Sequence, residues 1–341
     1  MYNLDKEVVK MEEKIKISIP SFTKDILLKD CENFNFYKDD NKINKNSFIN
    51  TLIVNYYERF SNDEKTLHDD LTNILLDSLE IYDSNVLDQI IKVLDKRNNN
   101  KNKEDTTVSL SFKPTKLSNK TIEYINNILI NNESISSYYR RLLNSYVHKP
   151  MNERELIIFK DNYETLTNSI NENLRVCIFL NNGTLYKDFS VYAVTPSKDE
   201  LFNYIVGVDS HNNLFTIRLN KINNVTLTNK KREINKEDIE ILKKQIKRGV
   251  QYPISRDEQE EIVVRLNDEG KRLFKRIYLY RPTPTKIEGD LYYFDCSYSQ
   301  ANQYFRRFGK HAIIESPSKL GIALKVYYKN ANKAYKEIYY K

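Results

Sequence analysis

Two segments of the chain alternate strictly between apolar and polar residues. In residues 14–19 the three isoleucines share one face of a predicted strand, and residues 107–112 alternate in the same way. A period of two residues is typical of a strand with one buried face. Two predicted helices follow each strand, and the second helices, opening at Ser47 and Ser137, match in pattern at an offset of 90 residues. The pattern predicts an internal repeat.

The order strand, helix, helix resembles the ribbon-helix-helix module, whose two strands pair and present outward side chains to the major groove of DNA. We expect the copies, residues 14–60 and 106–148, to pair their strands within or between chains. The outward ribbon face is then Lys14, Lys16, Ser18, Thr107, Ser109 and Ser111. Only two of these are basic, and the face lacks the Arg, Asn and Gln side chains that form the best bidentate contacts with bases. The ribbon is therefore either a DNA reader or a structural, dimerising module.

A helical insert, residues 61–96, separates the two copies. Its apolar residues recur at helical spacing and predict two helices broken near residues 83–85. Residues 61–95 hold nine acids and two lysines, which disfavours contact with nucleic acid. The polar run of residues 97–106 has no periodicity and is predicted to be a linker. These elements together form a predicted region of residues 1–150.

Short strands with close turns are typical of residues 172–235. A connecting helix over residues 151–171 precedes them, and Asn181-Asn182-Gly183 is a hairpin signal. The predicted strands cover residues 174–180, 190–196, 202–208 and 214–222. Closely spaced strands of this kind predict a small barrel. The next segment, residues 236–248, is predicted to be a helix.

Two of these strands resemble those of the WYL domain, a small SH3/Sm-like barrel of bacterial regulators. The matching residues are Tyr204, Ile205 and Gly207 in one strand, and Arg218, Leu219 and Ile222 in the next. The chain departs from the family pattern at Asn203, where the family has Trp, and at Asn220 and Lys221, where it has Asp and Arg. Lysine at 221 keeps the charge but loses the bidentate geometry of arginine.

Residues 236–341 are similar to the ferredoxin-like α/β extension that follows WYL domains and commonly dimerises. The Phe-Gly-x-x-Ala-x-x-x-x-Pro run of residues 308–317 carries this resemblance. With the preceding ribbon elements, the whole α+β chain resembles the WYL-type accessory proteins of type VI-D CRISPR systems. The pieces that match are residues 154–159, 202–204, 274–282 and 305–310. This resemblance implies a homodimer that binds single-stranded RNA and stimulates an RNA-guided RNA nuclease.

The positive charge is concentrated in the second half of the chain. The formal net charge is +7, and residues 1–150 carry −1 whereas residues 151–341 carry +8, of which residues 201–341 carry +11 and residues 151–200 carry −3. A basic surplus is typical of a protein that contacts a phosphate backbone. It is also expected of any chain from a lysine-rich proteome.

Cations interleaved with aromatic rings are the side chains that single-stranded nucleic acid requires. The predicted WYL site consists of Tyr192, Tyr204, Arg218 and Lys221. Alternatively, Tyr204 packs in the core and Arg218 pairs with a carboxylate. The predicted C-terminal basic site consists of Lys243, Lys244, Lys247, Arg248, Arg306 and Arg307. The first four share one helix face, which is either a phosphate-contacting stripe or a solvated surface.

Motifs of nucleotide, metal and nucleophilic enzymes are missing from the sequence. The seven glycines form neither a GxGxxG nor a P-loop, and no HExxH or GxSxG occurs. The three cysteines are too far apart for a metal cluster or a disulfide framework. The acidic residues 258–261 lack a ligand spacing. We therefore expect no catalytic residue, no metal and no cofactor.

The sequence predicts a protein that stays in the cytoplasm. It has no uninterrupted apolar run of the length needed to span a bilayer, and its charged N-terminus is not a secretory signal. We expect a non-enzymatic modulator that binds single-stranded RNA for a CRISPR effector nuclease. The alternative is a transcriptional regulator that binds duplex DNA through the ribbon and senses a nucleotide or single-stranded ligand. A third hypothesis is an interaction scaffold.

Overall fold

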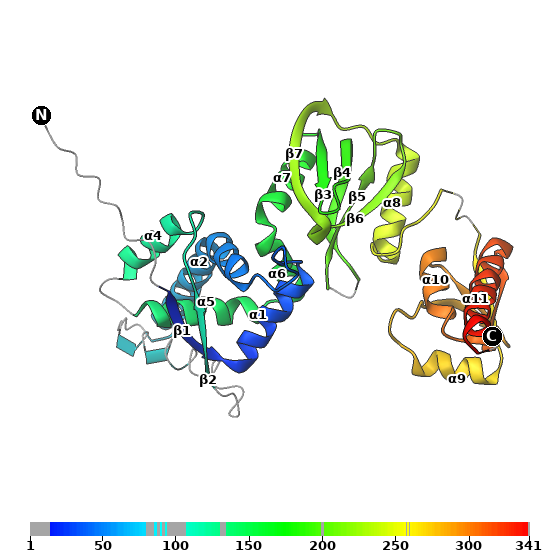
Figure 1. Cartoon of the computed structure of the whole chain (residues 1–341), viewed down its shortest axis with the longest axis horizontal. Helices are drawn as coiled ribbons and strands as arrows, with labels where there is room; N and C mark the ends of the chain where they lie inside the picture. Colours follow the sequence, from blue (N-terminus) through cyan, green and yellow to red (C-terminus); the bar gives the residue numbers. More distant parts are fainter. Residues whose placement is uncertain are drawn as a thin grey trace, which may run out of the picture. The chain divides into compact units, whose positions relative to one another are not determined.

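The computed structural model shows a mixed helix and sheet protein with small sheets. It describes residues 14–79, 85–86, 89–90, 93, 107–129, 134–198, 201–256, 258 and 260–339. The chain divides into two compact units, Met1–Lys160 and Asp161–Lys341, whose elements are labelled in Figure 1.

The first unit consists of a two-stranded ribbon packed on helices. Its elements are β1 (Ile15–Pro20), α1 (Ser21–Asn33), α2 (Lys45–Leu79), β2 (Thr107–Phe112), α4 (Asn119–Leu129), α5 (Ile135–Val147) and α6 (Met151–Ile158). The inward residues of the ribbon, among them Ile17 and Leu110, are buried. The alternation in the sequence therefore marks the core face correctly.

The two ribbon segments pair with each other within one chain. β1 and β2 are antiparallel in one register, from Ile15 opposite Phe112 to Pro20 opposite Thr107. The pairing predicted between residues 14–19 and 107–112 is confirmed. The outward face of the ribbon consists of the residues expected from the sequence, because successive side chains on a strand point to opposite faces. Ser18 lies opposite Ser109 near its centre.

The repeat extends to the caps of the second helices. The side chain of Asn44 accepts a hydrogen bond from the Ser47 amide at 3.1 Å, and that of Ser134 accepts one from the Ser137 amide at 3.2 Å. Both cap residues satisfy an amide that the helix leaves unpaired. The helices consequently begin two residues before the predicted starts at Ser47 and Ser137. The offset of 90 residues between the copies holds at the caps as well.

A pair of tyrosines joins the two copies at the centre of the unit. Tyr56 of α2 and Tyr146 of α5 are fully buried, and their ring centroids lie 6.2 Å apart in an edge-on arrangement. The Tyr56 and Ser145 hydroxyls share a hydrogen bond of 2.8 Å. The Tyr146 hydroxyl donates to Asp30 at 3.0 Å. Both polar ends are therefore satisfied inside the core.

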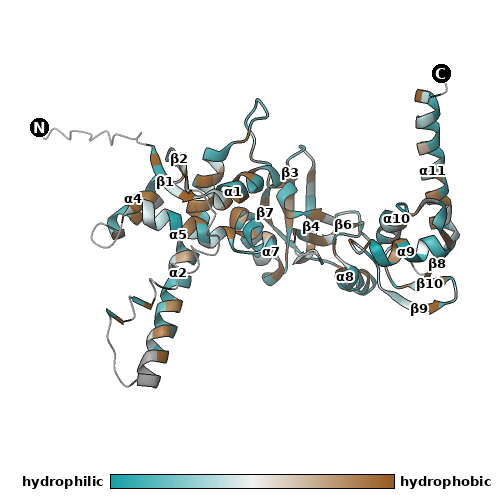
Figure 2. Ribbon diagram, turned by 90° about the horizontal axis from the view of Figure 1, so that it is seen from below, coloured by the Kyte–Doolittle hydropathy of each residue, from teal (hydrophilic) through white to brown (hydrophobic). Residues whose placement is uncertain are grey.

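The helix α2 is longer than expected. The second helix of the first copy continues without a break into the insert, and α2 spans 35 residues. No glycine or proline occurs in this stretch to stop it. Figure 2 shows α2 running on past the other elements of its unit. The predicted insert is therefore not a separate element from residue 61, while the break near residues 83–85 and the linker 97–106 lie largely outside the described residues.

The predicted connecting helix of residues 151–171 is two helices. α6 ends at Ile158 and α7 spans Lys160–Asn171. The side-chain amide of Asn55 donates to the carbonyls of Ile157 and Ile158, at 3.0 and 3.1 Å. The Phe159 ring packs edge-on against Phe34, with centroids 5.9 Å apart. These contacts within the first unit divide the helix at Phe159.

A five-stranded antiparallel sheet forms the first part of the second unit. Its elements are β3 (Leu174–Leu180), β4 (Leu185–Pro196), β5 (Asn203–Val208), β6 (Leu214–Arg218), η1 (Leu219–Lys221), β7 (Ile222–Lys231) and α8 (Lys236–Arg248). The strand order is β6-β5-β4-β3-β7. After Arg218, η1 turns the chain so that β7 pairs with β3. The predicted closed barrel is wrong, since no ladder among the described residues joins β6 to β7.

Gly207 lies where two strands of this sheet approach closely. A Cβ atom at this position would collide with the carbonyl oxygen of Ser190 and lie 2.7 Å from Cε1 of Phe189. A glycine inside a strand often marks such an approach. The glycine of the matched strand pattern is therefore required by packing in this sheet.

A four-stranded antiparallel sheet forms the C-terminal part. Its elements are β8 (Ile262–Leu266), α9 (Asp268–Arg276), β9 (Pro284–Glu288), β10 (Leu291–Phe294), α10 (Tyr298–Phe305), η2 (Gly309–His311), β11 (Ala312–Ser316) and α11 (Ser318–Tyr339). The strand order is β11-β8-β10-β9. The order of elements up to β11 is the split β-α-β pattern. Aromatic residues of α9, β10 and α10 dominate its core, with Phe274, Phe294, Tyr304, Phe305 and Phe308 buried.

Candidate nucleic-acid interface

Two predicted site residues meet across neighbouring strands. Tyr204 of β5 lies directly opposite Arg218 of β6, and both side chains are half-buried. Residues directly opposite in an antiparallel pair project from the same face of the sheet. Strand pairing therefore places Tyr204 and Arg218 on one face of the sheet.

The Arg218 guanidinium rests on an aromatic ring that the predicted site did not include. Its Cζ atom lies 3.0 Å from the centroid of the Phe202 ring. A cation held over a ring is stabilised by the ring's negative face and is fixed in orientation. Phe202 stands two residues before Tyr204, so strand alternation is the sequence signal by which it could have been found. We call Phe202, Tyr204 and Arg218 the stacking rim.

The rim continues into the packing between the sheet and α8. Tyr204 and Tyr192 pack against the buried residues Val206, Val208, Leu242 and Val250. Tyr192 stands at a bulge of β4, where the register with β5 shifts. The two tyrosines are therefore partly core residues and partly surface residues.

Lys221 is separated from the rim by η1. It is exposed, and its carbonyl oxygen accepts a hydrogen bond of 2.9 Å from the amide of Asn181. Among the described residues, no carboxylate forms an ion pair with its side chain. Its backbone is thus fixed by the β3–β4 turn while its ammonium group remains in solvent.

The basic residues of α8 divide into two kinds. Arg248 is half-buried and forms an ion pair with Asp295. The hydrogen bond from Arg248 is the largest cause that lowers the pKa of Asp295, and the charges of Lys244 and Lys247 lower it further. Lys243 forms an ion pair of 2.8 Å with Glu240. Of the four predicted site residues on this helix, Lys244 and Lys247 are the two that are exposed and form no ion pair within the described residues.

The two arginines after α10 also differ. The Arg307 side chain donates to the carbonyls of Tyr304 and Leu279, at 3.3 and 2.9 Å, and its guanidinium lies 4.9 Å from the centroid of the Tyr304 ring. It ties two loops together. Arg306 is exposed and lies 5.8 Å from the centroid of the Tyr327 ring. Both arginines are exposed, and Arg307 differs in that hydrogen bonds to two backbone carbonyls hold its guanidinium in place.

Asn203, at the position of the family tryptophan, faces away from the rim. It is buried, and it neighbours Tyr204 on the strand, so its side chain projects to the other face of the sheet. The departure from the family pattern therefore alters the core on that face. It leaves the three residues of the stacking rim in place.

Glu258, in the acidic run of residues 258–261, has a structural role. The Glu258 carboxylate accepts hydrogen bonds from the amides of Tyr298 and Ser255, at 2.9 and 3.2 Å. Glu258 therefore links the first residue of α10 to Ser255. Within the described part of the chain, no group of three or more His, Cys, Asp and Glu side chains is arranged to hold a metal ion.

The three cysteine thiols differ in burial. Cys31 and Cys296 are buried, and this burial is the largest cause that raises the pKa of each to about 12. Cys177 is half-exposed. Because the thiolate is the reactive form, we expect iodoacetamide at pH 8 to alkylate Cys177 ~10-fold faster or more than the other two. Peptide mass spectrometry measures the rates, and equal rates in the folded chain would contradict this prediction.

No family model and no curated protein matches this chain. Among solved structures, it resembles one described as the crystal structure of a CRISPR Cas-related protein, with a TM-score of 0.65 and 17% identity over 99% of this chain and 98% of that one. The fold is therefore shared along the whole length. The proteasome accessory factor B/C of Arthrobacter aurescens matches 48% of this chain and 26% of its own, at 9% identity and a TM-score of 0.22.

None of the helices in the described ranges has both the length and the apolar character of a membrane span. The longest of them, α2, carries most of its charged residues from Glu58 onward.

Proposed function

We propose that this chain is a non-enzymatic regulatory protein that binds single-stranded RNA at the stacking rim. The observation that carries the proposal is that Tyr204 lies opposite Arg218 on the neighbouring strand, while the Arg218 guanidinium stacks on the Phe202 ring. An aromatic ring beside an oriented guanidinium offers a base one π-face and one cationic face. Such contacts are tolerant of sequence, because every base has a π-face.

The cations around the sheet supply the contacts to phosphate. Lys221, Lys244 and Lys247 are exposed and form no ion pair within the described residues, and residues 201–341 carry a net charge of +11. Arg248 and Arg307 are assigned to structural roles by their contacts. The side chains proposed to contact the RNA phosphates are therefore fewer than the basic residues that the sequence suggested.

We further propose that the protein acts with a CRISPR effector nuclease. The resemblance of the sequence to WYL-type accessory proteins supports this role. The full-length likeness to a solved structure described as a CRISPR Cas-related protein supports it independently. The resemblance to WYL-type accessory proteins implies RNA rather than DNA, stimulation of the effector and homodimerisation through the C-terminal part, and these belong to the same proposal. The cytoplasmic location expected from the sequence is proposed with them.

A second candidate function is that of a transcriptional regulator which reads duplex DNA. The pairing of β1 with β2 favours it, because the ribbon is complete within one chain. Its outward face presents Lys14, Lys16 and hydroxyl side chains. Hydroxyls and lysines discriminate bases less well than arginine or amide side chains do. We therefore place this function second.

A binding titration separates the two functions. Labelled single-stranded RNA, single-stranded DNA and duplex DNA of one random sequence are titrated at two salt concentrations. The variant Arg218→Ala/Lys221→Ala removes the cation of the stacking rim and the exposed cation of η1. The control Lys29→Ala/Lys120→Ala removes two exposed charges of the first unit. We expect the first variant to weaken RNA binding about tenfold or more and to lower the salt slope by ~0.7 for each phosphate that is no longer neutralised, and the control to bind normally.

Two results would count against this proposal. Preference for duplex DNA, with the rim variant unaffected, places function in the ribbon. Binding to none of the three nucleic acids leaves the scaffold hypothesis.

A further inference from the structure

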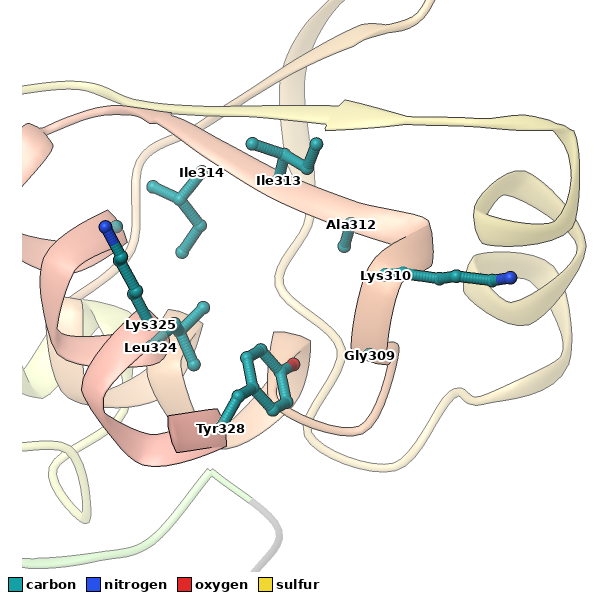
Figure 3. A pocket seen from close by; sticks show the side chains of 9 residues that line it. Gly309, Lys310, Ala312, Ile313, Ile314, Leu324, Lys325 and Tyr328 are labelled. Atoms are coloured by element: carbon teal, nitrogen blue, oxygen red, sulfur yellow. The ribbon is translucent and has the colours of Figure 1, made fainter. Parts of the chain in front are cut away.

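An apolar pocket lies between β11 and α11, away from the stacking rim. It has a volume of about 590 Å³ and is lined chiefly by Ala312, Ile313, Ile314, Leu324 and Tyr328. Figure 3 shows the side chains of Leu324 and Tyr328 rising from the helix toward Ile314 on the strand. Pockets of ~300–1,000 Å³ with mostly apolar walls are typical of small-molecule sites.

The walls of this pocket are fixed by the core and by hydrogen bonds. Ile314 and Leu324 are buried members of the C-terminal core. Gly321 lets α11 approach the strand, because a Cβ atom there would lie 2.9 Å from the carbonyl oxygen of Ile314. The Tyr328 hydroxyl donates to the carbonyl of Arg306 at 3.1 Å, which holds the ring at the pocket. The hollow is therefore part of the folded structure.

Two lysines stand at the ends of the pocket. Lys310 follows Gly309 in η2 and Lys325 follows Leu324 in α11, and both are exposed. Figure 3 shows them on opposite sides of the apolar walls. In the described ranges, neither lysine forms an ion pair with a carboxylate. An apolar cavity between two such cations is complementary to a molecule with an apolar body and an anionic group.

We propose that this pocket binds a small amphipathic anion, with its apolar part against Ile314, Leu324 and Tyr328 and its charge beside Lys310 or Lys325. The side chains that line the walls offer few polar groups, which disfavours a nucleotide or a sugar. A ligand body that covers the apolar walls removes their surface from water. This site is independent of the nucleic-acid-binding proposal.

The test uses the fluorescent anion 8-anilinonaphthalene-1-sulfonate and its displacement by decanoate on the full-length protein. We expect saturable binding at one site and displacement by decanoate but only weakly by decanol. Lys310→Gln/Lys325→Gln is expected to lower the affinity for the sulfonate about tenfold. The control Lys329→Gln/Lys336→Gln removes the same charge from exposed positions of α11 outside the pocket lining and is expected to bind normally.

A second variant reverses a charge at the mouth without disturbing the core. Lys325→Glu places a negative charge there and is expected to abolish displaceable binding. Its control, Lys336→Glu, makes the same change at an exposed residue of α11 outside the pocket lining. Near-ultraviolet circular dichroism verifies that the variants keep their tertiary packing, since partly folded proteins also bind this dye.

Three outcomes would overturn the proposal. Equal displacement by decanol and decanoate shows that charge is not recognised. Unchanged binding in Lys325→Glu places the dye elsewhere. A molar mass that falls from dimer to monomer in Lys325→Glu, measured by light scattering at the titration concentration, shows that the face is an interface between copies of this chain.

Discussion

Replacement of Arg154 by alanine is expected to lower the free energy of unfolding of the first unit by about 3–5 kcal/mol, because a buried charge loses its partner. Arg154 binds Asp30 through two hydrogen bonds, Nε to Oδ2 at 2.7 Å and Nη2 to Oδ1 at 3.1 Å. The Asp30 side chain is 1% exposed and that of Arg154 is 12% exposed. Urea denaturation followed by far-ultraviolet circular dichroism measures the loss of stability.

Tyr146 belongs to the same network. Its hydroxyl donates to Asp30, and burial first, followed by the charge of Asp30, raises the pKa of this hydroxyl well above its usual value. The hydroxyl therefore stays protonated and remains a donor to the carboxylate. In the absence of Arg154, this neutral donor still binds Asp30 but cannot compensate its charge.

An exposed ion pair in the same unit is the control for Arg154. Arg59 pairs with Glu153 at 3.0 Å, with side chains 47% and 37% exposed. We expect Arg59→Ala to cost ~1 kcal/mol or less, since solvent screens an exposed pair. Asp30→Asn/Arg154→Met, which removes both charges, is expected to lose less stability than Arg154→Ala alone. A loss below about 1 kcal/mol for Arg154→Ala would contradict the role assigned to this network.

Replacement of Tyr204 by leucine is expected to weaken binding of single-stranded RNA by about 5- to 150-fold, which corresponds to the ~1–3 kcal/mol that stacking on one aromatic ring contributes per base. Leucine retains the apolar packing with Val206 and Leu242, so the sheet is expected to keep its structure. The salt slope is expected to stay unchanged, because the same number of phosphates is neutralised.

The matched variant Lys244→Gln/Lys247→Gln is expected to behave in the opposite way. It removes exposed cations of α8 and should lower the salt slope by ~0.7 for each phosphate that these lysines neutralise, with a smaller reduction of affinity at high salt. Fluorescence anisotropy at four salt concentrations measures both quantities. If Tyr204→Leu lowers the slope and leaves affinity at high salt unchanged, the ring does not stack on bases.

Local patterns predicted most of the individual elements. The alternation in residues 14–19 and 107–112 placed both ribbon strands, and the predicted helix of residues 236–248 has the observed bounds of α8. The hairpin signal at residues 181–183 lies between two paired strands. These features depend on neighbours within a few residues, which the sequence displays directly.

Long-range contacts decided where the predictions failed. Asn55 and Phe34 divide the helix of residues 151–171 at Phe159, although nothing in the local sequence stops a helix there. The sheet stays open because β7, which follows η1, pairs with β3 and not with β6. The contrast between Arg306 and Arg307, which are identical neighbours in the sequence, arises because Arg307 is the one that meets the carbonyls of Tyr304 and Leu279.

The sequence by itself determined the repeat, the basic second half and the two strands that hold Tyr204 and Arg218. Periodicity and composition are enough to predict these features, because both are read directly from the order and types of residues along the chain. Only the tertiary structure placed Phe202 under Arg218, tied Arg248 to Asp295 and opened a pocket beside Gly321. Each of these depends on the distance between groups that the chain brings together from separate elements, and such distances are set by packing.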